Sequence, residues 1–210
     1  MSTDTIAAVA TAMSDSGIGI VRVSGEQSIA IVDRIYRNKN GEKCLSGYKS
    51  HTIHYGFIVD EKESVIDEVM VSVMKAPRSY TAEDTVEINC HGGVLIVQKI
   101  LSMTLAAGAR TAEPGEFTKR AFLNGRIDLS RAEAVMDLIH AKNEFALQSS
   151  VKQLKGAVFE KIKELRKSIL YEIAFIESAL DDPEHISLDG YPQKLHGIVE
   201  KEQKSIEELL

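Results

Sequence analysis

The residues best suited to binding or catalytic chemistry are charged side chains that lie far apart in the sequence: Arg22, Glu87 and Arg126. Arg22 closes an alternating run and shares one strand face with Ile18 and Ile20. An unpaired guanidinium on an apolar face carries a large desolvation cost, so Arg22 needs an anionic partner. Its fixed fork of donors suits carboxylate or carbonyl oxygens. In the alternative interpretation, Arg22 lies at the strand end and its side chain reaches solvent.

Glu87 is a carboxylate inside a strand pattern, between Val86 and Ile88. The strand leads into His-Gly-Gly at 91–93, where small residues allow a ligand to approach the backbone closely. A carboxylate accepts two parallel hydrogen bonds from an amidine-like edge, such as that of a pterin or guanine. Glu87 is therefore a candidate for reading a heterocycle. Two alternatives remain: an exposed strand carboxylate, or a partner for Arg22.

Arg126 follows Asn124-Gly125, a pair that is typical of turns. It belongs to the segment 113–129, which mixes turn residues, aromatic residues and charges and which we expect to form a loop and a helix cap. From this turn the Arg126 side chain could point into a cleft between two regions of the chain.

Motifs for other chemistry are absent from the sequence. None of the patterns G-x-x-x-x-G-K-[ST], G-x-S-x-G or H-E-x-x-H occurs, so nucleotide hydrolysis is not encoded in these residues. The histidines are not spaced for a metal site, and we expect no metal ligands. Cys44 and Cys90 suit a reducing compartment and offer neither a disulfide framework nor paired zinc ligands.

The charge balance and the hydropathy narrow the class of protein. Lys and Arg number 25 against 31 Asp and Glu, a net charge of −6 that opposes strong nonspecific binding to a phosphate backbone. The most apolar helical stretch, 94–107, is interrupted by polar residues and is shorter than the ~20 residues that span a bilayer. The N-terminus lacks the features of a secretion signal. We therefore expect a cytoplasmic protein with no membrane span.

The first hundred or so residues combine strand and helix patterns. A capping box at 24–27 predicts one helix, and the turn Gly92-Gly93 leads into another. Apolar alternation predicts strands over 18–23, 53–59, 69–73 and 86–88, with 60–63 as a hairpin connection. The residues expected to face inward are Ile29, Val32 and Ile35 in the first helix and Val94, Val97, Leu101 and Leu105 in the second.

From about residue 118, helical spacing replaces β-branched alternation. We therefore expect an α+β protein, with a mixed α/β domain over 1–118 and an all-α region, a partial helical bundle, over 119–210. The predicted helical features are a second capping box at 130–133, a stripe through 135–146, a long helix over 158–180 and a last helix with Pro192 in its first turn. This last helix reaches residue 210 in mid-pattern, which we interpret as the sign of a fragment.

Several stretches of the sequence resemble the N-terminal part of the tRNA modification GTPase family MnmE, also called TrmE, and the similarity spans the whole chain. The segment from Glu113 through Lys142 is the most specific of them. The others are Asp4-Thr5-Ile6-Ala7-Ala8, the run 17–25, Ser79-Tyr80-Thr81-Ala82-Glu83-Asp84 and Cys90-His91-Gly92-Gly93.

The resemblance implies that residues 1–118 form a domain similar to the tetrahydrofolate-binding domain of one-carbon transferases, which dimerises and binds 5-formyltetrahydrofolate, or methylenetetrahydrofolate, near the dimer interface. It implies that 119–210 begin a helical domain whose remaining helices, with the inserted GTPase domain, are absent from this chain. GTP, magnesium and potassium would belong to that GTPase domain. The family works with the flavoprotein MnmG to install an aminomethyl-type group on the wobble uridine of tRNAs.

The resemblance also assigns roles to residues. Glu87 matches a glutamate that would accept hydrogen bonds from the pterin edge, and Arg22 and Arg126 match basic positions that would meet carbonyl or glutamate-tail oxygens. One departure is the run 11–16, which replaces a loop rich in proline and glycine and places Asp15 near an anionic ligand. Two other functions are weighed against this one: a scaffold that only dimerises, and a stand-alone folate-dependent aminomethyltransferase.

Overall fold

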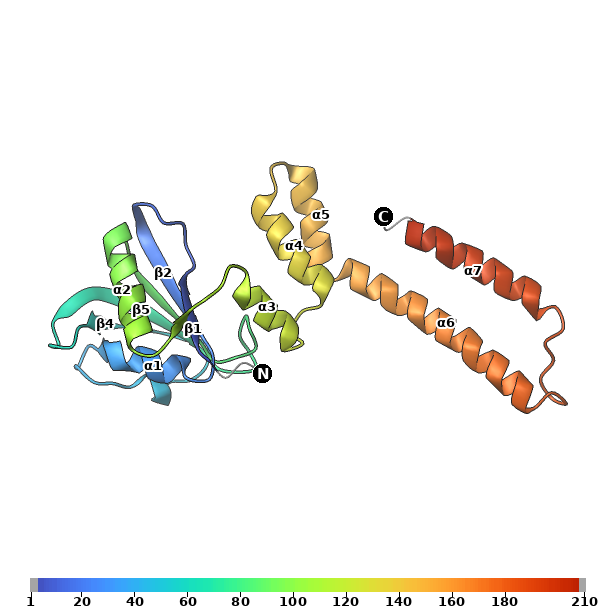
Figure 1. Ribbon diagram of the computed structural model, residues 1–210, viewed down its shortest axis with the longest axis horizontal. Coiled ribbons are helices and arrows are strands. Elements are labelled where there is room, and N and C mark those ends of the chain that lie inside the picture. The colour runs from blue at the N-terminus through green and yellow to red at the C-terminus, as the bar shows by residue number, and fades with distance from the viewer. Residues whose placement is uncertain (1–3, 208–210) are drawn as a thin grey trace. The chain divides into compact units, whose positions relative to one another are not determined.

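The computed structural model describes residues 4–207, which form two compact units that divide between Ile127 and Asp128 (Figure 1). The first unit is built around a mixed seven-stranded sheet, and the described part of the second unit consists of helices and their connections. The expected fold class, a mixed α/β domain followed by a helical region, is confirmed. No helix in the described part of the chain is long and apolar enough to cross a membrane.

The sheet has the strand order β3-β4-β5-β6-β2-β1-β7. Neighbouring strands are antiparallel except β1 and β7, which are parallel. The predicted hairpin is confirmed, because β4 and β5 pair along their length across the turn after Val59. The strands are β1 (Ile6–Val9), β2 (Ser16–Ser24), β3 (Tyr36–Asn38), β4 (Thr52–Val59), β5 (Val65–Met74), β6 (Thr85–Gly92) and β7 (Arg110–Thr111).

Two helices, α1 (Ser28–Ile35) and α2 (Val94–Ala106), pack on one face of the sheet and enclose the core (Figure 1). Gly19 lets α2 lie directly on β2, because a Cβ atom there would collide with the Val97 side chain. The inward residues predicted for α1 are buried. In α2, Val97 is buried and Leu101 and Leu105 are partly buried against the core as predicted, while Ile100 and Thr104 are buried in addition. Fully buried strand residues of this core include Val21, Val23, Val71, Val86 and Ile88.

The opposite face of the sheet, here called the outer face, carries exposed apolar side chains. Ile18 is 63% exposed, Met70 52% and Tyr55 47%. Arg22 lies on this outer face, because Val21 and Val23 on either side of it point into the core. Arg22 and Ile18 share one strand face, as predicted, but that face is the outer face and not the one that packs on the core.

Both predicted capping boxes are wrong in detail. Ser24 ends β2, and its Oγ bonds to Thr81 and Glu83 rather than to a helix N-terminus. Helix α1 begins four residues later, without a side-chain cap. In the second unit the N-cap is Asp128, which accepts the backbone N–H of Arg131. In the first place tertiary contacts engage the hydroxyl that the pattern suggested, and in the second the earlier acceptor Asp128 takes its role.

Helix α3 (Glu116–Leu123) lies inside the segment that we expected to be a loop and a cap. Its buried Arg120 donates to the backbone carbonyl and carboxylate of Asp4 and lies within 3.3 Å of both carboxylate oxygens of Glu83. Arg120 also pairs with Glu116 one turn earlier. These contacts join α3 to the first unit, so the division between the compact units falls after residue 127, whereas the sequence suggested a boundary at 118.

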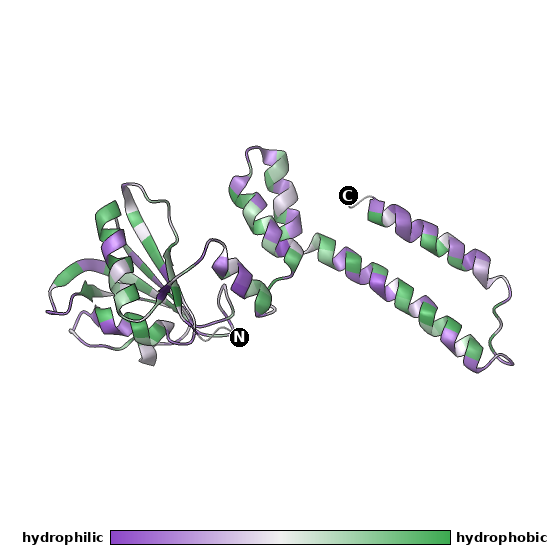
Figure 2. Ribbon diagram, in the orientation of Figure 1, coloured by the Kyte–Doolittle hydropathy of each residue, from purple (hydrophilic) through white to green (hydrophobic). Residues whose placement is uncertain are grey.

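The second unit contains α4 (Leu129–His140), α5 (Glu144–Leu154), α6 (Ala157–Asp181) and α7 (Tyr191–Glu207). The predicted stripe over 135–146 is divided between two helices, because Asn143 caps α5 by accepting the N–H of Ala146. The long helix and the position of Pro192 are confirmed by α6 and α7. Figure 2 shows hydrophobic and hydrophilic residues alternating along α6.

We predict that Arg120→Ala destabilises the first unit by about 3 to 5 kcal/mol, because it leaves three carboxylates near one another without their shared buried cation. Amide hydrogen exchange of β1 and β2 measures this loss. Lys119→Ala is the matched control, since Lys119 is an exposed neighbour on the same helix. Equal exchange in the two variants would show that Arg120 does not hold α3 in place.

A fall in pH should weaken the ion pairs of Glu116 with Arg110 and Arg120. Hydrogen bonds from Arg110 lower the pKa of Glu116 to about 2 from its ordinary value of 4.5. Because the folded pKa is the lower one, ionised Glu116 stabilises the fold above about pH 4.5, and this contribution is lost as the pH falls toward 2. Glu116→Gln should therefore flatten the acid dependence of unfolding in that window. Glu113→Gln, at an exposed site, should keep the dependence of the parent, and a parent-like profile for both variants would contradict the assignment.

Candidate functional site

The centre of the candidate site is an ion pair between neighbouring strands. Antiparallel pairing of β2 with β6 sets Arg22 directly opposite Glu87. The Nε atom of Arg22 donates to Oε1 of Glu87 at 2.7 Å, and the two side chains are only 28% and 22% exposed. The anionic partner expected for Arg22 is thus Glu87, as one of the alternatives for Glu87 had it.

Tyr80 connects this pair to the third predicted residue. The Cζ atom of Arg22 lies 5.5 Å from the centre of the Tyr80 ring, and Cζ of Arg126 lies 5.1 Å from the same centre. Both distances are within the range of favourable cation–π contact. The structure therefore brings Arg22 and Arg126 together around one aromatic ring, with Glu87 paired to Arg22, although the three residues are distant in sequence.

Helix α3 supplies a further wall. Cζ of Arg22 lies 5.6 Å from the centre of the Phe117 ring. The next residue, Thr118, shares a 2.9 Å hydrogen bond between its Oγ1 and the Tyr80 hydroxyl. No local pattern in the sequence distinguishes Tyr80, Phe117 or Thr118, although each lies in a segment that carries the resemblance.

The electrostatic balance of this cluster is positive. Two guanidinium groups approach the Tyr80 ring, and Glu87 neutralises only one of them. Among the described residues, Arg126 has no carboxylate within ion-pair distance. The pair with Arg22 uses Oε1 of Glu87, and in the described part of the chain Oε2 accepts no side-chain or backbone donor. The cluster thus offers unpaired donors and an unfilled carboxylate oxygen to a ligand with both kinds of group.

The altered loop over 11–16 lies at a distance from these residues. The exposed Asp15 directly precedes β2, whereas Arg22 lies near the other end of that strand. At about 3.3 Å per residue, the two positions are roughly 20 Å apart along the backbone. The side chain of Thr11 accepts the N–H of Ile20, which ties this loop back to β2. A direct contact between Asp15 and the arginine cluster is therefore not part of the site.

Comparison with protein families matches both units. The model described as "GTP-binding protein TrmE N-terminus" matches residues 5–126, and the model described as "MnmE helical domain" matches residues 129–210. The junction between the two matches coincides with the division between the compact units.

Curated relatives match along the whole chain. A tRNA modification GTPase MnmE from Lachnoclostridium phytofermentans is 60% identical over 210 residues, which are 100% of this chain and 46% of the relative. Proteins with the same description from Geobacillus kaustophilus and Bacillus subtilis are each 51% identical, over 99% of this chain and 45% of the relative. The chain therefore spans about half the length of the curated relatives it matches.

Proposed function

The chain belongs to the MnmE (TrmE) family of tRNA modification GTPases, and from this membership we propose that its first unit binds a one-carbon derivative of tetrahydrofolate. In this proposal the ligand is 5-formyltetrahydrofolate or methylenetetrahydrofolate, the source of the carbon that the whole protein transfers to the wobble uridine of tRNA. The observation that supports it is the convergence of Arg22 and Arg126 on the Tyr80 ring, with Glu87 paired to Arg22.

Each group in the cluster has a matching part in a reduced folate. Glu87 would accept hydrogen bonds from the N–H groups at the edge of the pterin, because a carboxylate can take two parallel bonds while Oε1 keeps its bond to Arg22. Arg126 would meet the carboxylates of the glutamate tail, and Arg22 a carbonyl oxygen. Tyr80 and Phe117 would supply aromatic walls for the flat rings of the ligand.

We further propose that the first unit forms a homodimer through the outer face of the sheet. One face of an antiparallel sheet is commonly solvated and polar, yet Ile18, Ile53, Tyr55 and Met70 are all exposed here. Their row continues into the candidate site, because Ile53 pairs with Ser72, which pairs in turn with Glu87. A second copy on this face would cover apolar surface beside the site.

The remaining assignments concern the whole protein. GTP, magnesium and potassium would act in its GTPase part, since these 210 residues contain no G-x-x-x-x-G-K-[ST] sequence. The partner would be the flavoprotein MnmG, with tRNA in the full complex and the cytoplasm as the compartment. Catalysis would be completed by those partners, and the first unit would contribute the folate.

The folate site is tested by calorimetric titration of 5-formyltetrahydrofolate into the chain. The parent should bind, and Glu87→Gln should bind more weakly by about 2 to 5 kcal/mol, because the variant loses a charged acceptor and leaves Arg22 unpaired. Glu26→Gln is the matched control, since Glu26 is exposed in the turn before α1. Unchanged affinity in Glu87→Gln would refute the role of this carboxylate, and a folded dimer that binds no folate would favour the scaffold function.

The dimer is tested by solution mass. The parent should have twice the mass of one chain, and Met70→Glu should shift the mass toward the monomer, because a carboxylate in an apolar interface is costly to desolvate. Leu95→Glu places the same charge at an exposed position of α2 and should leave the mass unchanged. A monomeric parent, or two variants that behave alike, would remove this face from the proposal.

A further inference from the structure

A groove lies on the helix-covered side of the first unit, away from the outer face. It is formed by the end of α1, the turn between β4 and β5, and the second half of α2, and its volume is about 750 Å³. Its apolar lining includes Met103 and Ala106 of α2 and Ala107, the C-cap of that helix. The basic residues that line it are Arg34, Arg37, Lys43, Lys62 and Lys99.

The basic residues of this groove exceed its acidic ones, and the acidic ones are largely occupied. Three carboxylates line the groove, those of Asp60, Glu61 and Glu63. Glu63 pairs with Arg37, and Asp60 accepts the backbone N–H groups of the turn that follows it. The lysines of the groove, Lys43, Lys62 and Lys99, are exposed and form no ion pair within the described part of the chain. They are therefore available to an anion.

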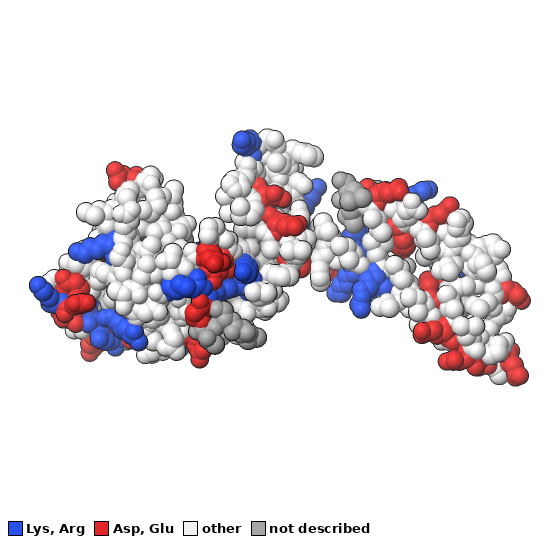
Figure 3. All heavy atoms as spheres, in the orientation of Figure 1, with Lys and Arg blue, Asp and Glu red and all other residues white. Residues whose placement is uncertain are grey.

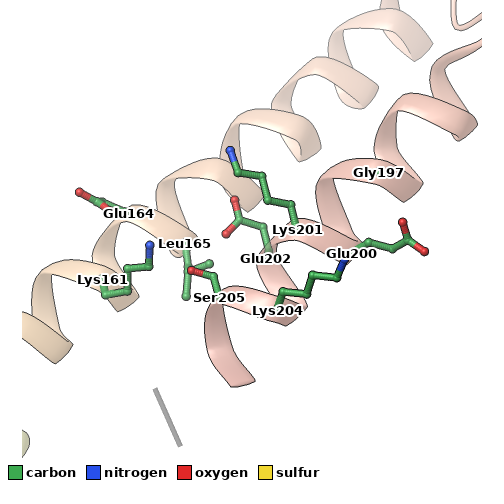
Figure 4. Close-up of a pocket in the computed structure, with 9 residues that line it drawn as sticks. All are labelled: Lys161, Glu164, Leu165, Gly197, Glu200, Lys201, Glu202, Lys204 and Ser205. Atoms are coloured by element: carbon green, nitrogen blue, oxygen red, sulfur yellow. The ribbon is translucent and has the colours of Figure 1, made fainter. Parts of the chain in front are cut away.

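A groove of the second unit provides a contrast. It lies between α6 and α7 and has a volume of about 600 Å³ (Figure 4). Its charged side chains are balanced, with three lysines and three glutamates. The groove of the first unit is lined by five basic and three acidic residues, and Figure 3 shows Lys and Arg atoms next to Asp and Glu atoms at the end of that unit where α1 and α2 lie in Figure 1. The cationic groove is thus a local exception in a chain whose net charge is −6.

We propose that this cationic groove binds the phosphodiester backbone of RNA. The recognition would be electrostatic, because lysines that neutralise phosphates release condensed counterions and so gain affinity without reading a sequence. RNA, rather than another polyanion, follows from the tRNA substrate of the proposed function, on which this inference rests. The groove and the arginine cluster around Tyr80 are separate sites, so one can fail without the other.

The combination of basic and apolar surface in the groove fits the phosphodiester backbone of RNA better than a small anion. A compact phosphate would gain little from the apolar surface of Met103 and Ala106, whereas ribose groups can pack on it. The lysines come from three different segments: the loop before Leu45, the β4–β5 turn and α2. Cations spread along a groove match phosphates that are spaced along a strand.

The test measures fluorescence anisotropy of a labelled tRNA transcript titrated with the 210-residue chain at several salt concentrations. The parent should bind with an affinity that falls as salt rises, and the double variant Lys43→Glu/Lys99→Glu should bind about tenfold more weakly. The slope of log affinity against log salt should fall by about 2, one unit for each phosphate contact removed.

The matched control is Lys201→Glu/Lys204→Glu in the charge-balanced groove of the second unit, which changes the net charge by the same amount at exposed positions. Affinity within about twofold of the parent in this control supports a local site. Equal weakening in both double variants would mean that only overall charge matters, and no binding by the parent would also overturn the proposal. Displacement of tRNA by equimolar inorganic tripolyphosphate would show that the groove takes small phosphates instead.

Calorimetry with 5-formyltetrahydrofolate on the same double variants separates the two hypotheses. Parent-like folate binding by Lys43→Glu/Lys99→Glu, together with weakened tRNA binding, supports a distinct RNA site. If the parent binds tRNA in the groove but no folate, the proposed folate function fails while the groove stands. If folate binds and tRNA does not, the groove proposal alone is wrong.

Discussion

The buried guanidinium of Arg120 is the interaction through which distant parts of the first unit are held together. Its partners come from the start of the chain, from the segment before β6 and from α3 itself: Asp4, Glu83 and Glu116. A cation that is removed from water is tolerated only when several anionic or carbonyl acceptors surround it. The arrangement is a compromise, since Nε of Arg120 is buried without a partner among the described residues. Arg110 shares Glu116 and extends the same network to β7.

The candidate site depends on this network and on one strand register. The register of β2 and β6 decides that Arg22 faces Glu87, which a shift by one residue would undo by turning one side chain to the other face. The position of α3 decides that Thr118 reaches Tyr80 and that Phe117 lies near Arg22. The strands therefore supply the charges and α3 supplies the aromatic and hydroxyl groups around them.

The sequence predicted well those elements that a local pattern of apolar residues determines. The β4–β5 hairpin and the long α6 have a clear periodicity of apolar residues, and both were found. Helix α3 was missed because its stability comes from Arg120 and partners as distant as Asp4, which no local window contains. The division of the α4–α5 stripe was missed because Asn143 as an N-cap interrupts a pattern that otherwise continues.

The arginine and the glutamate of the site could be predicted because an ion inside a strand pattern demands a partner whatever the fold. Tyr80 could not be found in that way, since a tyrosine in a loop is not unusual until two arginines are seen to share its ring. Alternation also did not reveal which face of β4 is buried, because apolar residues occupy both faces. Ile58 and Val59 are buried, while Ile53 and Tyr55 are exposed.

That exposure has a physical consequence for the site. Arg22 and Glu87 are each about three-quarters buried, so solvent still screens their interaction. If a second copy covered the adjacent Ile53 and Tyr55, water would be displaced from the edge of the cluster and its hydrogen bonds would strengthen. The same change would raise the cost of leaving Arg126 without an anion. Dimerisation and ligand binding would then favour each other, because each would exclude water from polar groups whose interactions contribute to the other. This coupling must be reciprocal.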